Sequence, residues 1–356
     1  MLYNDTINEK KIYLLHKKMY FTANQKEKVK ERNVAMAKKT LREYMKEKKF
    51  YYVPEIFDCI STRAAEMNGF QMVMISSSDF ACSQTGIPDL NLLSVDEYCN
   101  MIERITYMTD MPLFVDADEG FGRPLQAYHA CKRMARSGAD CILITDGKEL
   151  SQPGLASIED ACYRYKAAKD GMAGTDCLLM ASCKQSIDEH YDDFVERCNR
   201  YIEAGADIIC PLELNRSTKY GGKLGGARQV VKDVHVPFWY PDLDPGDKAE
   251  DAEELLSLGY HFTGIHYSFR AAMYAMLDSG RHVFETHTND YVMKHYDYTG
   301  YHFYYSPMAC FLADGKWAEL EQRYVKNPED AFAYRKQKGF CGPTDKLVPD
   351  NDLPEI

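Results

Sequence analysis

Eight short apolar runs alternate with helix-sized amphipathic stretches between residues 50 and 280, and no linker rich in Pro, Gly or Ser interrupts them. Most runs are continuously apolar, which is typical of parallel strands covered on both faces. A strand followed by a helix, repeated eight times, predicts a (β/α)8 TIM-type barrel. The expected strands are residues 50–53, 72–76, 112–118, 141–145, 177–182, 207–212, 237–242 and 262–267.

Helix boundary signals favour the same fold. Ser94 precedes an amphipathic stretch, and Glu97 lies three residues after Ser94. This spacing predicts a capping box at a helix start. Four glycines end helical stretches and predict left-handed C-terminal caps: Gly69, Gly138, Gly205 and Gly259. An open doubly wound sheet is the alternative fold, but no GxGxxG motif follows the first expected strand.

Residues 50–280 are therefore the expected barrel domain, with an N-terminal helical segment at 1–49 and a C-terminal helical extension at 281–356. Mixed charges at helical spacing predict a solvated helix over residues 25–49, and an anchor for an anionic surface is the alternative. The Tyr-rich extension is expected to pack on the barrel or on a neighbouring subunit; a membrane-facing aromatic patch is the alternative.

Charge and hydropathy exclude several classes of protein. The first 50 residues hold 14 Lys and Arg against 6 Asp and Glu, yet the whole chain has a net charge of −11, so the remainder is acidic and a poor partner for nucleic acid. No apolar run approaches a membrane span, and no signal peptide is recognisable, so we expect a cytoplasmic protein. The 12 cysteines form no CxxC pair or Cys/His cluster and predict reduced, mostly buried thiols.

The densest chemical signal is VDADEGFGRP, residues 115–124, at the end of the third expected strand. Asp116 and Asp118 are two residues apart, so on a strand both carboxylates point to the barrel mouth. Two adjacent carboxylates require a cation or a shared proton, and Mg²⁺, with Mn²⁺ as a substitute, suits such oxygen ligands. The alternative is that one Asp caps the next helix and the other pairs with Arg123.

Two weaker signals lie nearby. Ser76, Ser77 and Ser78 follow the second expected strand, where hydroxyls and backbone N–H groups in a turn would suit a carboxylate or an enolate oxygen. Asp89 follows Pro88 in a loop before a helix, where a plain turn aspartate is the alternative interpretation.

Three phrases occur in one order: FDCISTRAAEMNGF, MISSSDFACSQTGIPDLNLLSVDEY, and PLFVDADEGFG followed by SGADCILITD. Over residues 50–280 this combination resembles the isocitrate lyase and phosphoenolpyruvate mutase superfamily. The resemblance implies a magnesium enzyme that stabilises the enolate of a 2-oxo acid while a C–C or P–C bond at the adjacent carbon is made or broken.

The resemblance also assigns roles to residues. It implies that Asp116 binds the metal directly, that Asp118 and Asp89 hold the metal's waters, and that Ser76 to Ser78 receive the substrate's carboxylate or enolate oxygen. It further implies a homo-oligomer, a dimer or a tetramer, in which subunits exchange a helix that follows the eighth strand.

The sequence departs from the superfamily at three places. The Glu of the Ile-Glu-Asp element falls on Thr145, although Asp146 remains, so these two are only candidates for outer contacts to the metal site. The loop that carries the lyases' catalytic cysteine is shortened and has none. The substrate-binding Arg falls on Ser182, and Lys184, on the same side of the strand, is a candidate to restore the positive charge. Cys183 points the other way and is interpreted as a packing residue.

The leading functional hypothesis is a Mg²⁺-dependent lyase that makes or breaks a C–C bond beside a 2-oxo or 2-hydroxy carboxylate, with Asp89 and Lys184 as candidate catalytic residues and Ser182 as a substrate contact. P–C chemistry of the phosphoenolpyruvate mutase or phosphonopyruvate hydrolase type is the close alternative. A non-catalytic barrel that serves as a binding or scaffold protein is the alternative of a different class, although retained carboxylate clusters cost stability.

Overall fold

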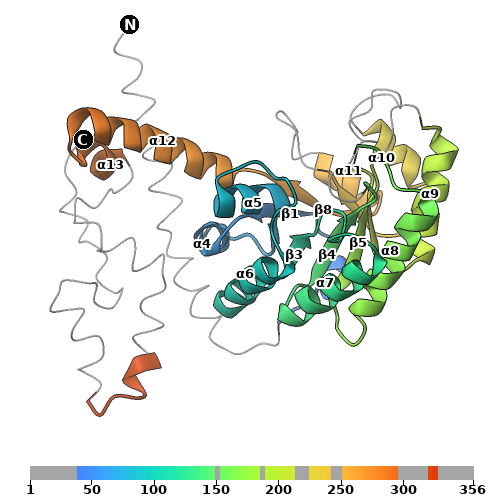
Figure 1. The fold of residues 1–356 in the computed structure, drawn as a ribbon, viewed down its shortest axis with the longest axis horizontal. Coiled ribbons are helices and arrows are strands. Elements are labelled where there is room, and N and C mark those ends of the chain that lie inside the picture. Colours follow the sequence, from blue (N-terminus) through green and yellow to red (C-terminus); the bar gives the residue numbers. More distant parts are fainter. Residues whose placement is uncertain are drawn as a thin grey trace, which may run out of the picture. The chain divides into compact units, whose positions relative to one another are not determined.

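The computed structural model describes residues 38–148, 153–184, 189–212, 224–241, 251–295 and 320–327. Within these residues, parallel strands pair in chain order and close into a barrel, because β8 pairs with β1 (Figure 1). The predicted (β/α)8 barrel is confirmed. The strands are β1 (Tyr51–Ile56), β2 (Val73–Ile75), β3 (Leu113–Asp116), β4 (Cys141–Thr145), β5 (Leu178–Ser182), β6 (Ile208–Cys210), β7 (Phe238–Tyr240) and β8 (Tyr260–Ile265).

The helices connect successive strands, and Figure 1 shows α7, α8 and α9 side by side on the outside of the barrel. Their bounds are α3 (Leu41–Met45), α4 (Cys59–Met67), α5 (Ser77–Thr85), α6 (Val95–Met108), α7 (Pro124–Ser137), α8 (Ile158–Gly171), α9 (Tyr191–Glu203), α10 (Gly225–Val230), α11 (Asp251–Ser257), α12 (Ser268–Thr286) and α13 (Asp290–His295).

Two apolar cores follow from the alternation of side chains along each strand. One core fills the barrel interior with alternate strand residues such as Val53, Phe114 and Phe262. Leu41 of α3 belongs to the same core, so α3 packs against the barrel interior. The other core lies between the strands and the helices and contains the intervening strand residues. Burial on both faces explains why the strands read as continuous apolar runs.

Strand ends differ from the sequence-based expectation at informative places. β4 has its predicted bounds, but β1 continues to Ile56 rather than ending at residue 53, since Glu55 and Ile56 pair with Met74 and Ile75 of β2. β3 ends at Asp116, so the prediction that Asp118 lies on a strand is wrong. Asp118 has a left-handed φ of 46°, a conformation that no β-strand contains.

The predicted helix signals are confirmed. Ser94 and Glu97 form the capping box at the start of α6, and Gly138 and Gly205 have φ values of 114° and 113° after α7 and α9. Every cysteine among the described residues is a free thiol, and seven of the ten are buried. No described helix has the length and apolar character needed to cross a bilayer.

The flanking segments are described only in part. In the predicted helical segment 1–49 the described residues begin at 38, and among residues 38–49 the helix is α3. Most of the predicted C-terminal extension, including the Tyr-rich stretch, lies outside the described residues. The domain boundaries therefore stay predictions.

Gly171 provides a test of the helical layer. A Cβ atom at this last residue of α8 would overlap the backbone carbonyl oxygen of Tyr128 in α7, whereas a Cβ on Gly280 of α12 would meet no atom within 4 Å. We expect Gly171→Ala to lower the free energy of unfolding by about 2–3 kcal/mol, because backbone cannot move aside as a flexible side chain can. Gly280→Ala should be neutral or stabilise by up to ~1 kcal/mol. Urea denaturation measures both, and equal effects would contradict the close packing of α7 on α8.

Candidate active site

A ring of polar side chains lies at the C-terminal mouth of the barrel. Along β2 to β5, every second side chain points into the barrel. On each of these strands the last inward-pointing apolar residue is followed, two positions on, by an inward-pointing polar residue. These positions are Ser76, Asp116, Thr145 and Ser182. Active sites of (β/α)8 enzymes are built at this end of the strands, so this ring is the candidate site.

The loop that follows β3 brings Asp118 back toward Asp116. The backbone N–H of Asp118 donates to Oδ1 of Asp116 over 3.1 Å, and Ser77 Oγ donates to Oδ2 over 3.3 Å. Gly120 and Gly122 have φ values of 79° and 126°, a left-handed conformation that glycine adopts without strain, and they permit this bend. The two carboxylates are thus neighbours because of the bend and not because of strand periodicity.

Burial and repulsion perturb both carboxyl groups. Burial is the main cause that raises the pKa of Asp116 to about 6, and the negative charge of Asp89 also raises it. The hydrogen bonds that Asp116 accepts from the Asp118 N–H and from Ser77 lower this pKa in part. Burial raises the pKa of Asp118 to about 8, with repulsion from Asp116 and Asp89 as the next causes. Each side chain keeps part of its surface open although protein surrounds most of it. Three aspartates therefore share one poorly solvated place.

The structure does not support the metal-free alternative. Arg123 is the N-cap residue of α7, and within the described ranges neither it nor another basic residue forms an ion pair with Asp116 or Asp118. Among the described residues, no group of three or more His, Cys, Asp or Glu side chains is placed to hold a metal ion by itself. Two unneutralised carboxylates with open surface fit a hard cation such as Mg²⁺, which keeps several waters and needs few protein ligands.

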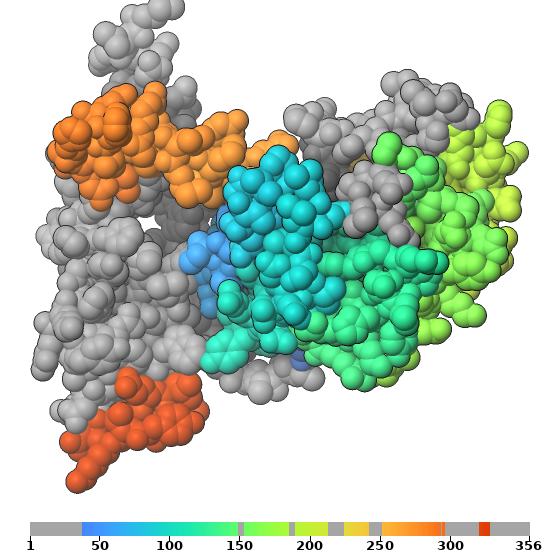
Figure 2. Space-filling view, in the orientation of Figure 1, coloured from blue at the N-terminus to red at the C-terminus, as the bar shows by residue number. Residues whose placement is uncertain are grey.

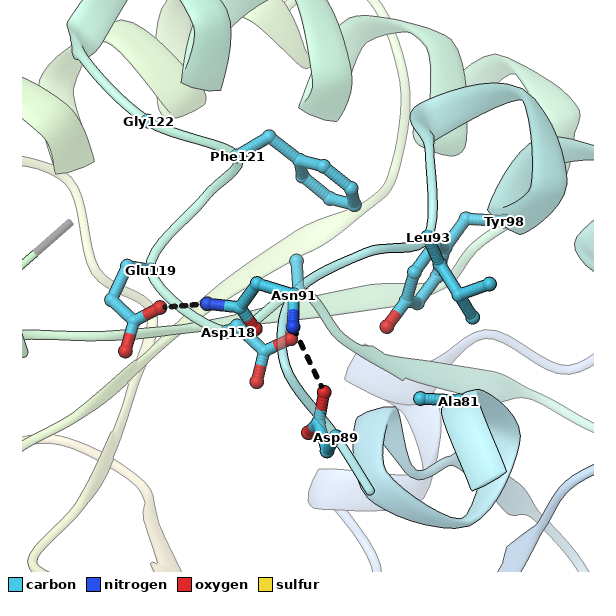
Figure 3. A pocket seen from close by; sticks show the side chains of 10 residues that line it. Ala81, Asp89, Asn91, Leu93, Tyr98, Asp118, Glu119, Phe121 and Gly122 are labelled. Atoms are coloured by element: carbon cyan, nitrogen blue, oxygen red, sulfur yellow. Dashed lines mark hydrogen bonds between the residues drawn. The ribbon is translucent and has the colours of Figure 1, made fainter. Parts of the chain in front are cut away.

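A cavity of about 90 Å³ opens beside these carboxylates (Figure 3). Asp89 and Asp118 line its polar side together with two residues that sequence reasoning missed, Asn91 and Glu119. Asn91 Nδ2 donates to Glu119 Oε2 over 2.9 Å, and Asn91 N–H donates to Asp89 Oδ1 over 3.4 Å. The opposite side is apolar and contains Ala81, Leu93, Tyr98 and Phe121.

The role of Asn91 had only a faint sequence signal. Its φ of 55° is left-handed, a conformation that Asn adopts more readily than most residues. The amide thereby ties the loop of Asp89 to Glu119 after β3. Glu119 follows Asp118 directly in the acidic motif, so its place near the site could have been predicted from the sequence. Its hydrogen bond with Asn91 could not.

The three serines differ from the expected turn. Ser76 is the N-cap residue of α5, and Ser77 and Ser78 are its first helical residues, with Ser76 Oγ 3.3 Å from Ser78 Oγ. Their hydroxyls remain near Asp116, because Ser77 contacts it directly. The predicted nest is thus a helix N-terminus, whose backbone N–H groups also suit an anion.

The candidates on β4 and β5 face the same mouth. Thr145 and Ser182 are paired in the ladder between the two strands, and both are buried. Lys184 follows β5, and its charge is among the influences that lower the pKa of Asp116, after the hydrogen bonds that this carboxylate accepts. Within the described part of the chain, Lys184 forms no ion pair with the aspartates, but its charge acts on Asp116.

Asp146 is held in a buried network. Its Oδ2 accepts from Arg197 Nη1 over 2.6 Å and from the Tyr201 hydroxyl over 3.2 Å, while its Oδ1 accepts from the backbone N–H of Lys184 over 2.9 Å. Burial raises the pKa of Asp146, and the Arg197 guanidinium opposes that shift. Oδ1 thus fixes the backbone at Lys184, just after β5, and Oδ2 joins this point to α9.

The interpretation of Cys183 as a packing residue is confirmed by its surroundings. The side chain is fully buried in the core between strands and helices, on the opposite face from Ser182. Burial raises the pKa of its thiol well above the ordinary value. A buried, protonated thiol of this kind is a poor acid or nucleophile for a ligand in the mouth.

Comparison with known proteins identifies relatives of the barrel. The family profile described as phosphoenolpyruvate phosphomutase matches residues 41–280. The chain is 31% identical over 181 residues to the 2-methylisocitrate lyase of Escherichia coli (strain K12), covering 49% of this chain and 59% of that one. It is 28% identical over 178 residues to the oxaloacetate decarboxylase of Paraburkholderia xenovorans (strain LB400), covering 48% and 60%. The matched part thus spans about three fifths of these relatives.

A solved structure shares the fold. A phosphonopyruvate hydrolase in complex with oxalate and Mg²⁺ superposes with a TM-score of 0.69 at 20% identity, covering 80% of this chain and 98% of that one. At this identity the likeness supports the barrel architecture and no finer statement.

The paired aspartates predict a pH dependence of stability without metal. Raised pKa values of about 6 and 8 in the folded protein, against the ordinary 3.8 when unfolded, mean that folding takes up protons between about pH 4 and 8. We therefore expect this contribution to stability to fall as pH rises through that window. Asp118→Asn should reduce the loss between pH 5 and pH 8 by at least ~1 kcal/mol. Urea denaturation in EDTA measures it.

The exposed Asp176 supplies the control, since Asp176→Asn should leave the pH dependence as in the unsubstituted protein. A loss of stability between pH 5 and pH 8 that is identical in Asp118→Asn and Asp176→Asn would contradict the carboxylate repulsion.

Proposed function

Because the chain belongs to the phosphoenolpyruvate phosphomutase family, we propose that it is a Mg²⁺-dependent lyase. The reaction breaks or forms a C–C bond beside the carbonyl or hydroxyl carbon of a small 2-oxo or 2-hydroxy carboxylate, through an enolate of the substrate. The observation that carries the proposal is the pair Asp116 and Asp118 at the mouth of the barrel, with raised pKa values and without a basic partner among the described residues.

Each residue of the site has a proposed task. Asp116 would bind Mg²⁺ directly, with Asp118 and Asp89 holding its waters and Thr145 as an outer contact. Asp146 would act only indirectly, since its carboxylate binds Arg197, Tyr201 and the backbone of Lys184. A bound Mg²⁺ supplies Lewis-acid stabilisation of negative charge on the substrate oxygen. Asp89 contributes further negative charge that favours cation binding.

The substrate's carboxylate is proposed to lie against the start of α5, where Ser76, Ser77 and Ser78 offer hydroxyls and N–H groups. Ser182 and Lys184 complete the opposite side, and Lys184 supplies the positive charge that the superfamily's Arg would otherwise give. An ammonium is a compact point charge and cannot bind a carboxylate with two parallel bonds as a guanidinium does. We therefore expect looser selection of the substrate's second acidic group than an Arg would impose.

Cleavage of a P–C bond is the second candidate reaction, favoured by the absence of a cysteine between β4 and the start of α8. Both reactions pass through the same enolate, so the products distinguish them. Release of inorganic phosphate from phosphonopyruvate identifies the second reaction. Release of a 2-oxo acid from a 2-hydroxy diacid, or of CO₂ from oxaloacetate, identifies the first.

The first test concerns the metal. We expect 5 mM MgCl₂, about 100 times a 50 μM dissociation constant, to stabilise the protein by ~2–3 kcal/mol. Asp116→Ala should abolish this stabilisation, and Asp176→Asn should retain it. Thermal denaturation with and without Mg²⁺ measures the shift. A barrel that binds or scaffolds without metal would show no stabilisation in any of the three proteins.

The second test concerns the enolate. In deuterated water with Mg²⁺, the protein should exchange the methyl protons of pyruvate or of a close 2-oxo acid, and Asp116→Ala should slow that exchange about 100-fold or more. Proton NMR follows the methyl signal. A broad panel of 2-oxo acids with no exchange, with either Mg²⁺ or Mn²⁺ present, would leave the lyase proposal without support.

We also propose a homo-oligomer in which α12 contributes to the interface. Tyr274, Leu277 and Phe284 are three and seven residues apart, so they share one face of α12, and they are 63% to 80% exposed. In Figure 2 this helix is orange and its side chains stand on the surface. Only Ser268 of α12 is buried within the chain. An exposed apolar face of this kind is typical of contact surfaces.

The oligomer is tested by substitution on that face. Leu277→Glu combined with Phe284→Ser should lower the molar mass in solution to that of the monomer, because charge and polarity oppose burial of the face. Multi-angle light scattering measures the mass. Thr286→Ser, on the opposite face of the same helix, should leave the mass unchanged. A monomeric unsubstituted protein would refute the proposal.

A further inference from the structure

A histidine and a glutamate meet at the seam where the barrel closes. The ladder between β1 and β8 pairs Pro54 with Ile265, so Glu55 comes opposite His266, the residue that follows β8. Glu55 Oε1 lies 3.0 Å from His266 Nε2, within hydrogen-bond distance. Asp79 Oδ2, from the first turn of α5, lies 3.7 Å from Nδ1 on the other side of the ring.

The three side chains are exposed to different degrees. The Glu55 side chain is 7% exposed and that of Asp79 is 15% exposed, whereas the imidazole is 32% exposed. The two carboxylates that flank the ring are thus less accessible than the ring itself, which is partly exposed. A recessed carboxylate beside an imidazole fixes the orientation of the ring and stabilises its protonated form. A histidine held in this way is suited to general acid–base catalysis.

The pair faces the same space as the proposed substrate. Val53, two residues before Glu55, is in the interior core, and Phe262 in that core is four residues before His266. Alternation therefore directs Glu55 and His266 to the inner face, as it does for Asp116 and Ser182. Asp79 belongs to the same first turn of α5 as Ser77 and Ser78. The imidazole and the aspartates thus belong to one mouth but lie on different strands.

The proposed reaction needs such a group. An enolate becomes a 2-oxo acid only when its carbon receives a proton, and the chain has no cysteine between β4 and α8 to donate it. Cys183 is buried in the outer core, with the pKa of its thiol raised. Among groups at the mouth, an imidazole is the one whose ordinary pKa lies near neutrality, where proton transfer in both directions is efficient.

We propose that His266 carries the proton to and from the substrate carbon next to the carbonyl, and that Glu55 is its positioning residue; this rests on the proposed function. In the protonation step, the Nδ1–H bond of the imidazolium breaks; Nδ1 lies 3.7 Å from Asp79 Oδ2, beyond hydrogen-bond distance, so its proton can pass to the substrate. Its proton forms a C–H bond with the electron pair of the enolate double bond, and the oxygen's electron pair restores the carbonyl. The neutral imidazole then takes a proton from solvent. The reverse sequence exchanges methyl protons of pyruvate.

The test uses the full-length protein with Mg²⁺ and pyruvate in deuterated water. His266→Gln should slow the exchange by about 10² to 10⁴-fold, the usual contribution of general acid–base catalysis. The Mg²⁺-induced rise in melting temperature should remain, since His266 is not among the residues proposed to hold the metal. His235→Gln, at an exposed histidine before β7, should exchange as the unsubstituted protein does.

Two further variants distinguish proton transfer by His266 from a purely structural role in joining β1 and β8. Free imidazole should restore part of the exchange to His266→Ala, which a role limited to joining β1 and β8 would not allow. Glu55→Gln, which keeps a hydrogen bond to the ring, should lower the maximal exchange rate about 10-fold while the half-saturating pyruvate concentration changes less than twofold.

The outcomes are distinct. If the unsubstituted protein exchanges pyruvate and His266→Gln does so within threefold, this inference is wrong while the proposed function stands. Lack of imidazole rescue in a folded, Mg²⁺-responsive His266→Ala would likewise overturn it. If the unsubstituted protein exchanges no 2-oxo acid, the proposed function fails and His266 loses its role with it.

Discussion

Repulsion between two carboxylates inside a poorly solvated mouth is the constraint on which the candidate site depends. Burial raises the pKa of both carboxyl groups, and repulsion from Asp116 raises the pKa of Asp118 further. A chain gains nothing in stability from such a pair, so the arrangement is a cost that the proposed cation would offset. The hydrogen bonds from Ser77 and the backbone hold the pair together against its own repulsion.

The barrel supplies the rigidity that this repulsion requires. Arg197 and Tyr201 of α9 bind Asp146, which in turn holds the backbone of Lys184. A buried ion pair costs desolvation, but removal of one partner would leave an uncompensated buried charge, so the network is sensitive to any single change. It fixes the end of β5 and the positive charge of Lys184 relative to the aspartates. The same closure joins β8 to β1 and brings His266 to Glu55.

Much of the fold could be predicted because parallel strands buried on both faces leave continuous apolar runs. β4 was predicted with its observed bounds, and the capping box at Ser94 and the left-handed glycines followed from local chemistry alone. The errors share one cause. Asp118 was assigned to a strand because the motif alternates, but the chain had already turned, and the residues of the motif do not reveal where inter-strand pairing stops.

By itself, the sequence determined the periodicity, the caps and the order of the acidic motifs, since each depends on residues within a few positions of one another. Only the tertiary structure decided which distant side chains meet: Asn91 with Glu119, Asp146 with Arg197, and Glu55 with His266. These contacts depend on the register between strands and on the closure of the barrel. Both are set by packing of the whole core rather than by any local segment.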